Sequence, residues 1–152
     1  MKTIICLIVD ESGSMEGKEN EVIEGYNTFI QDQLKLADEA RIHLLKFNSS
    51  VTMVLQDMPL VNVPLLNRNS YRPDGGTALY DAMADGINSV ALTKRSDERA
   101  VIVIITDGGE CSSKRYTEQQ VKDLIAKYKS LGHWSFVYIG ECAKEFAANM
   151  GI

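Results

Sequence analysis

Apolar residues follow two different patterns along this chain, and the two patterns alternate. Residues 3–9, 101–105 and 136–139 are short continuous apolar runs rich in β-branched side chains. Runs of this kind are typical of strands that are buried on both faces of a parallel sheet. The sequence therefore predicts at least three strands in the interior of a sheet.

Two further runs predict a hairpin. Residues 41–47 and 51–55 are separated only by Asn48, Ser49 and Ser50, a short connection of turn-forming residues. One strand is therefore expected to run antiparallel to its neighbour. Residues 56–76 contain three prolines and the pair Gly75-Gly76, and we expect a long irregular connection there.

Helical periodicity fills the segments between the strands. Apolar residues recur at steps of three and four over about residues 19–38, which predicts an amphipathic helix. A second helix is expected to begin after Thr77, whose hydroxyl can cap it. Thr117 and Gln120 form a capping-box pattern that opens a third helix, and residues 143–150 predict a short last one.

Strands that alternate with helices predict an α/β fold. We expect a three-layer sandwich with a mostly parallel, doubly wound sheet and one antiparallel edge strand. In such folds ligands bind beyond the carboxyl ends of the strands, near the point where the strand order reverses. Function should therefore be sought where the apolar runs end.

Length and charge narrow the function classes. The chain has 152 residues, 45% of them hydrophobic and 24% charged, which predicts a single globular domain over residues 1–152. Its net charge of −5 is the wrong sign for gripping a phosphate backbone, so we expect no nucleic acid partner. The first apolar run is too short for a signal peptide, and no stretch approaches the length of a membrane span. We expect a cytoplasmic protein without a membrane partner.

Cysteine and histidine offer no obvious site. Cys6, Cys111 and Cys142 form no CxxC pattern, and we expect reduced thiols. Cys111 and Cys142 each follow a predicted strand, so a redox pair is an alternative to two unpaired structural thiols, which we favour. His43 and His133 lie within and just before predicted strands and are expected to be core or edge residues.

Oxygen-bearing side chains follow two of the predicted strands. The first run is followed by Asp10, Ser12 and Ser14, and the run 101–105 is followed by Thr106 and Asp107. Because the carboxyl ends of parallel strands share one edge of a sheet, these side chains are expected to converge. The glycine pair before Thr77 lets the backbone come close to whatever it faces, so this hydroxyl can join them.

Two carboxylates and three hydroxyls suit a hard divalent cation such as Mg²⁺, which prefers oxygen ligands. Zinc and copper, in contrast, favour nitrogen and sulfur. The sequence therefore predicts a metal site with these residues: Asp10, Ser12, Ser14, Thr77 and Asp107.

The pattern Asp-x-Ser-x-Ser, a later threonine and Thr-Asp-Gly at residues 106–108 resemble the metal-ion-dependent adhesion site of von Willebrand factor type A domains. Residues 75–82 and 101–108 also resemble small stand-alone members from bacteria and their phages. The resemblance implies that the three hydroxyls bind Mg²⁺ or Mn²⁺ directly, while Asp10 and Asp107 act through waters or hold those hydroxyls. It also implies that a partner protein supplies an Asp or Glu to the metal. Family members commonly have a sixth strand after the last helix, so a sheet without that edge strand is one expectation.

Two other readings of the site stay open. Asp10 follows the first strand, where some α/β phosphatases carry a phosphoryl-accepting aspartate, so a metal-dependent phosphoryl-transfer enzyme or hydrolase with Asp10 as nucleophile is an alternative. Haloacid dehalogenase phosphatases have a second aspartate two residues later, where this chain has Ser12. A scaffold whose metal is only structural is the third possibility.

Acidic residues flank the predicted metal site. Glu11, Glu16, Asp74 and Glu110 are expected to form an acidic rim around it. Such a rim would repel a densely acidic partner, so we expect a partner whose metal-binding Asp or Glu has basic neighbours.

Overall fold

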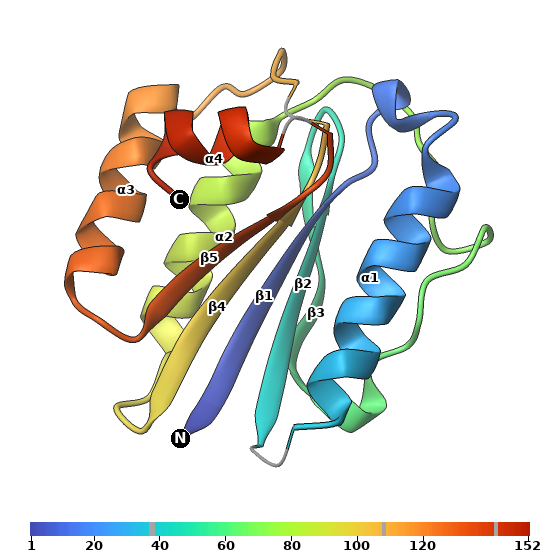
Figure 1. Ribbon diagram of the computed structural model, residues 1–152. Coiled ribbons are helices and arrows are strands. Elements are labelled where there is room, and N and C mark those ends of the chain that lie inside the picture. The colour runs from blue at the N-terminus through green and yellow to red at the C-terminus, as the bar shows by residue number, and fades with distance from the viewer. Residues whose placement is uncertain (37–38, 108, 142) are drawn as a thin grey trace.

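The computed structural model describes residues 1–36, 39–107, 109–141 and 143–152, and its strands are covered by helices on two faces (Figure 1). The helices and strands are, in chain order, β1 (Lys2–Asp10), α1 (Glu19–Leu34), β2 (Ala40–Phe47), β3 (Val51–Pro59), α2 (Leu79–Thr93), β4 (Glu98–Ile105), α3 (Glu118–Ser130), β5 (Trp134–Ile139) and α4 (Ala143–Met150). Two short 3₁₀ helices, η1 (Gly13–Met15) and η2 (Leu60–Asn62), lie in the connections.

The described strands form one sheet in the order β3-β2-β1-β4-β5. All neighbours pair in parallel except β3, which runs antiparallel to β2. The order reverses at β1, which lies between β2 and β4. Asp10 pairs with Phe47, and Val9 pairs with Ile105, so the three central strands end level at the upper edge of the sheet in Figure 1. The predicted α/β sandwich with one antiparallel edge strand is confirmed.

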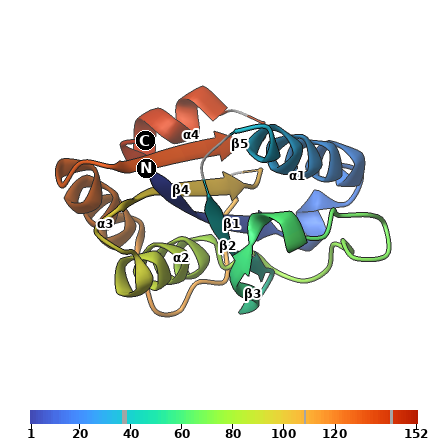
Figure 2. The same ribbon diagram turned by 90° about the horizontal axis from the view of Figure 1, so that it is seen from below.

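Two apolar layers fill the space between the sheet and the helices. Ile4, Cys6 and Ile8 of β1 pack with α2, α3 and α4 on one face, while Ile5 and Leu7 pack with α1 on the other. These strand residues are fully buried, as the uninterrupted apolar run predicts. Figure 2 shows α1 separated from α2 and α3 by the sheet. The core thus holds β1 rigidly and fixes the position of its carboxyl end.

Some predicted boundaries were wrong. β3 continues to Pro59, although the sequence predicted an irregular connection from residue 56, because two register shifts and an exposed outer surface remove the regular alternation. α1 ends at Leu34 rather than near residue 38. The N-cap of α2 is Ala78, without a side-chain hydrogen bond, so Thr77 does not cap this helix. The capping box of Thr117 and Gln120 is confirmed.

The predictions on histidine and cysteine have mixed outcomes. His43 is fully buried in β2, where Nε2 lies 3.1 Å from the Thr93 hydroxyl oxygen and Nδ1 accepts the Asp57 N–H, so it is a core residue as predicted. Cys6 is buried and Cys111 is exposed, and both are free thiols. Cys142 lies outside the described residues, so the alternative of a redox pair between Cys111 and Cys142 stays untested. Within the described segments, none of the helices has the length and apolar character needed to cross a membrane.

Candidate functional site

Asp10 forms the centre of the predicted site. It is the last residue of β1 and is fully buried. Its Oδ1 accepts the Ser12 N–H at 2.8 Å, and its Oδ2 accepts the Thr106 hydroxyl at 2.6 Å. Burial raises the pKa of Asp10, while the hydrogen bonds from Ser12 and Thr106 counteract part of that rise. The carboxylate is therefore held by two neutral donors, a backbone N–H and a hydroxyl.

The turn after Asp10 presents two hydroxyls. Ser12 precedes the 3₁₀ turn Gly13–Met15, and the buried Met15 side chain anchors this turn to the core. The turn brings Ser12 Oγ to 3.0 Å from Ser14 Oγ, with Ser12 buried and Ser14 exposed. Two oxygens from the predicted set therefore lie side by side at the end of β1.

Asp107 approaches from the end of β4. Its Oδ1 accepts the Gly109 N–H at 3.1 Å, and its Oδ2 lies 3.5 Å from the Lys18 ammonium. Burial alone would raise the pKa of Asp107, but the Gly109 N–H, the Ser14 hydroxyl and Lys18 together lower it. This carboxylate therefore stays ionised and contacts the same serine loop that Asp10 positions.

The glycine pair allows two loops to touch, as the sequence predicts. The Gly13 N–H donates to the Gly75 carbonyl at 2.8 Å, and Gly75 adopts a positive φ of 81°, which favours glycine. A Cβ on Gly76 would come within 2.2 Å of Ser112 Oγ. A side chain at Gly75 would strain the backbone, and one at Gly76 would require the Ser112 hydroxyl to move.

Thr77 follows the glycine pair and is buried. Its N–H donates to Cys111 Sγ at 3.3 Å, and its carbonyl accepts the N–H groups of Cys111 and Ser112. The backbone of Thr77 is thus tied to the segment after β4, while its loop reaches the serine turn through Gly75.

The start of α2 is capped by a distant segment. The Glu110 carboxylate accepts the Tyr80 N–H at 3.2 Å, and Ser113 Oγ accepts the Asp81 N–H at 3.0 Å. In return, the buried Asp81 carboxylate accepts the N–H groups of residues 114–116. These reciprocal bonds replace the expected Thr77 cap and hold the loops around Thr77 and Asp107 together.

The arrangement fits a hard divalent cation in its donor chemistry. Asp10, Ser12, Ser14 and Asp107 are connected through direct contacts, and Thr77 lies on the loop that bonds to Gly13. Across residues 1–36, 39–107, 109–141 and 143–152, no three His, Cys, Asp or Glu side chains cluster in a way that could hold a metal. The predicted set, however, consists mainly of hydroxyls with two carboxylates, which magnesium and manganese accept.

The acidic rim is less open than the sequence suggested. Glu16 and Asp74 are exposed. The Glu11 carboxylate accepts the Arg72 N–H at 3.0 Å and lies 3.7 Å from the Lys46 ammonium. Glu110 is occupied at the start of α2. Two of the four expected rim carboxylates are therefore engaged within the chain.

Three residues that the sequence analysis did not assign to the site contact the predicted set. Thr106 holds Asp10, and the Tyr71 hydroxyl donates to the Asp10 carbonyl from the irregular connection after β3. Lys18 contacts Asp107 from the start of α1. Thr106 could have been inferred because it precedes Asp107 at the same strand end. Tyr71 and Lys18 carried no comparable pattern.

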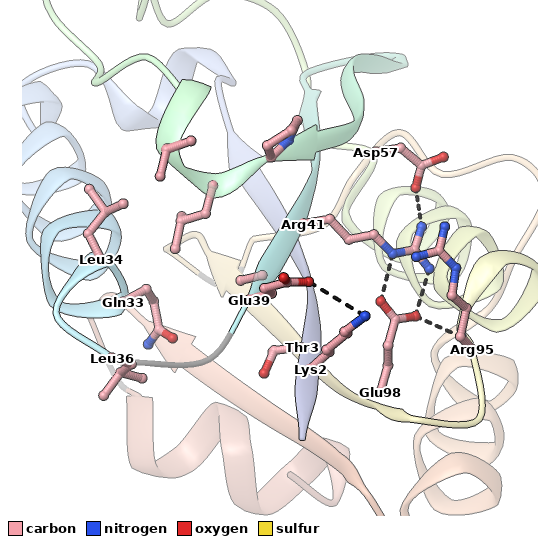
Figure 3. Close-up of a pocket in the computed structure, with 14 residues that line it drawn as sticks. Lys2, Thr3, Gln33, Leu34, Leu36, Glu39, Arg41, Asp57, Arg95 and Glu98 are labelled. Atoms are coloured by element: carbon pink, nitrogen blue, oxygen red, sulfur yellow. Dashed lines mark hydrogen bonds and ion pairs between the residues drawn. The ribbon is translucent and has the colours of Figure 1, made fainter.

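A cavity of about 540 Å³ lies at the opposite edge of the sheet (Figure 3). Arg41 and Glu98 form its charged wall, with Arg41 Nε and Glu98 Oε2 2.8 Å apart. Arg41 also bonds to the Thr93 carbonyl and to Asp57, and Glu98 accepts the Arg95 N–H. Because Arg41 and Glu98 already satisfy each other, this pair offers few groups for an outside ligand.

Comparisons with known proteins agree with the fold. A family model for the von Willebrand factor type A domain matches residues 5–110. The uncharacterized protein sll0103 of Synechocystis is 26% identical over 106 residues, which are 68% of this chain and 24% of that protein. The chain thus spans about a quarter of the length of this relative.

Solved structures with the same fold include two proteins of low sequence identity. The manganese-loaded TRAP protein of Plasmodium vivax has a TM-score of 0.65 at 16% identity, over 99% of this chain and 63% of that one. The pilus adhesin SpaC of Lactobacillus rhamnosus GG has a TM-score of 0.62 at 16% identity, over 98% of this chain and 26% of that one. The sheet order, the strand-end loops and the family match lead to one conclusion: the chain belongs to the von Willebrand factor type A domain family.

Proposed function

We propose that this chain, as one domain over residues 1–152, is a protein-binding module that depends on Mg²⁺ or Mn²⁺. Ser12, Ser14 and Thr77 would bind the ion through their hydroxyls. Asp10 and Asp107 would act through waters or by orienting those hydroxyls. The bound ion supplies an electrophilic centre that can accept a carboxylate oxygen from a partner protein.

The observation that carries the proposal is the pair of serine hydroxyls 3.0 Å apart between two carboxylates. Both oxygens of Asp10 are engaged with Ser12 and Thr106, which suits a residue that orients the loop rather than one that donates freely to an ion. The inner ligands are then mostly neutral, so a partner's Asp or Glu is the natural source of the missing charge. The manganese in the related TRAP structure supports the choice of ion.

A partner protein is favoured over a reaction. SpaC, which shares this fold, is a pilus adhesin, and this supports binding as the role proposed for this chain. A nucleophilic role for Asp10 fits the geometry less well, because the side chain is fully buried and both of its oxygens already accept hydrogen bonds. We therefore propose a non-enzymatic module.

Calorimetry with MnCl₂ and MgCl₂ tests the metal site. We expect one ion per chain in the wild type and loss of measurable heat in the Ser12→Ala, Ser14→Ala variant, because two ligand oxygens are removed together. The matched control is Ser50→Ala, Ser96→Ala, which removes two exposed hydroxyls outside the site and should bind like the wild type. Equal affinity in the wild type and the site variant would overturn the assignment.

The partner is tested with the same proteins. The wild-type chain should capture a partner protein from a lysate in Mn²⁺. This capture should be lost in EDTA and in the Ser12→Ala, Ser14→Ala variant. An excess of free acetate should weaken it. Capture that ignores both the chelator and the variant would show that binding does not use the metal site.

A further inference from the structure

Lys18 is an unusual residue for its position. It occupies the N-cap of α1 and makes no capping hydrogen bond with its side chain. Ser, Thr, Asp or Asn would be favoured there, and a cation at this end opposes the helix dipole. Lys18 therefore lowers the stability of the helix, and its side chain makes its contacts outside α1.

Those contacts are with two carboxylates at the strand ends. The Lys18 ammonium lies 3.5 Å from Asp107 Oδ2 and 3.5 Å from Glu141 Oε2. The Lys18 side chain is 27% exposed and that of Asp107 is 12% exposed, whereas Glu141 is 60% exposed. Solvent therefore screens Glu141 more strongly, and Asp107 is the better shielded partner.

The backbone of Lys18 gives the side chain a fixed origin. Its N–H donates to the Met15 carbonyl at 2.9 Å, and its carbonyl accepts the Val22 N–H at 3.1 Å. Its side chain lines a cavity of about 300 Å³ that also includes Met15, Val22 and Asp107. The ammonium is thus held beside a carboxylate of the proposed metal site.

This position changes the charge of the site by one unit. Asp10 and Asp107 together carry two negative charges. A divalent ion would cancel these two charges, and Lys18 would add a positive charge beside it, which the exposed Glu141 offsets only in part. The same ammonium would repel an ion that approaches Asp107, because like charges repel each other, by about 1 kcal/mol for two unit charges at about 4 Å in water.

We propose that Lys18 sets the balance between the two binding steps of this site: it weakens the binding of the metal and strengthens the binding of a partner's carboxylate to the loaded site. The inference rests on the proposed metal-dependent function. Lys18 is a positioning and charge-setting residue in this account, and it is not a metal ligand.

The test compares Lys18→Met with the wild type in two titrations. Met keeps the length of the side chain and removes its charge. Calorimetry with MnCl₂ should show about tenfold tighter binding in the variant. Mn²⁺-dependent broadening of the acetate methyl NMR signal should show acetate binding weakened by several-fold. Lys18→Gln provides a second neutral variant, and thermal unfolding in EDTA checks that each protein is folded.

Two controls separate this role from a general charge effect. Lys18→Arg keeps the charge and should leave both affinities near those of the wild type. Lys46→Met removes another shielded lysine, which is paired with Glu11 at the end of β2, and should change both affinities much less.

The two affinities must move in opposite directions. Unchanged Mn²⁺ affinity in both neutral variants, or weaker binding of both Mn²⁺ and acetate, would overturn the inference while leaving the proposed function intact. A wild type that binds no Mn²⁺ would overturn the proposed function, and this inference with it.

Discussion

The two edges of the sheet treat buried charge in opposite ways. At the edge where the parallel strands begin, which we call the amino edge, Glu98 is held by Arg41. The side chain of Glu98 is only 3% exposed and that of Arg41 is 13% exposed. At the edge where these strands end, which we call the carboxyl edge, Asp10 is fully buried. Its carboxylate oxygens are held by a backbone N–H and a hydroxyl. The amino edge neutralises Glu98 with a cation of the chain, whereas Asp10 at the carboxyl edge is held by neutral groups, with the Lys18 ammonium on the neighbouring Asp107.

This difference suggests that the amino edge contributes to the stability of the fold and the carboxyl edge to the binding of a cation. A carboxylate that faces a guanidinium has no need of an outside ion, so we expect the amino edge to contribute mainly to folding. A buried carboxylate held by neutral groups costs folding free energy and keeps an attraction for a cation. The pKa values agree: hydrogen bonds from Arg41 lower the pKa of Glu98 to about 2, whereas burial raises the pKa of Asp10.

Breaking the amino edge should have the largest effect on stability. Arg41→Met leaves the Glu98 carboxylate buried without its cation, and such a loss costs about 3 to 5 kcal/mol of unfolding free energy. Urea denaturation at pH 7 measures this loss. The control is Lys35→Met, which removes an exposed pair with Asp32 and should cost less than about 1 kcal/mol. Similar losses in the two variants would contradict the contrast between the edges.

The second-largest expected effect is a loss of unfolding free energy in acid, as Glu98 at the amino edge takes up a proton. The pKa of Glu98 is lower in the folded chain than its ordinary value of 4.5, so the unfolded chain takes up the proton first. The stabilisation, about 3 kcal/mol, is complete above pH 4.5 and is lost as the pH falls toward about 2. Asp10 acts in the opposite direction, because its raised pKa makes protonation favour the folded chain.

Denaturation of the wild type and Glu98→Gln from pH 2 to pH 7 measures this effect. The difference in unfolding free energy should be largest near neutral pH and should shrink below pH 4.5. A difference that stays constant over this range would show that the Glu98 charge contributes nothing to stability.

The smallest change in stability is expected at the carboxyl edge. Asp107 lies just beyond the buried end of β4 and is paired with the half-buried Lys18, so Asp107→Ala should alter the unfolding free energy in EDTA by about 1 kcal/mol or less. The same variant should lose metal binding in calorimetry. If Asp107→Ala unfolds the chain, the carboxyl edge is as structural as the amino edge.

Much of the fold could be predicted because its determinants are local. The uninterrupted apolar runs of β1 and β4, the periodicity of α1 and the capping box of α3 each lie within one segment. β3 was predicted too short because its outer surface is exposed and its pairing shifts register twice. The cap of α2 could not be predicted, since Glu110 and Ser113 come from about thirty residues further along the chain.

The candidate site shows the same division. The hydroxyls and carboxylates could be identified because they follow strands that end at one edge, and their role as metal ligands stays a prediction. The cytoplasmic location also stays a prediction. Tyr71 and Lys18 were missed because each reaches the site from another element, and Lys18 breaks the usual preference at a helix start.

The bond between Thr106 and Asp10 joins residues 96 positions apart, so the proposed site takes its parts from segments that are synthesised at different times. A growing chain that ends after α2 already contains Asp10, the two serines and Thr77. It lacks β4, the neighbour that pairs with β1 and delivers Asp107 and the Thr106 hydroxyl. Contacts of such long separation form late because closing the intervening loop costs entropy first. The proposed metal site would therefore be completed only after β4 has been synthesised and has docked beside β1.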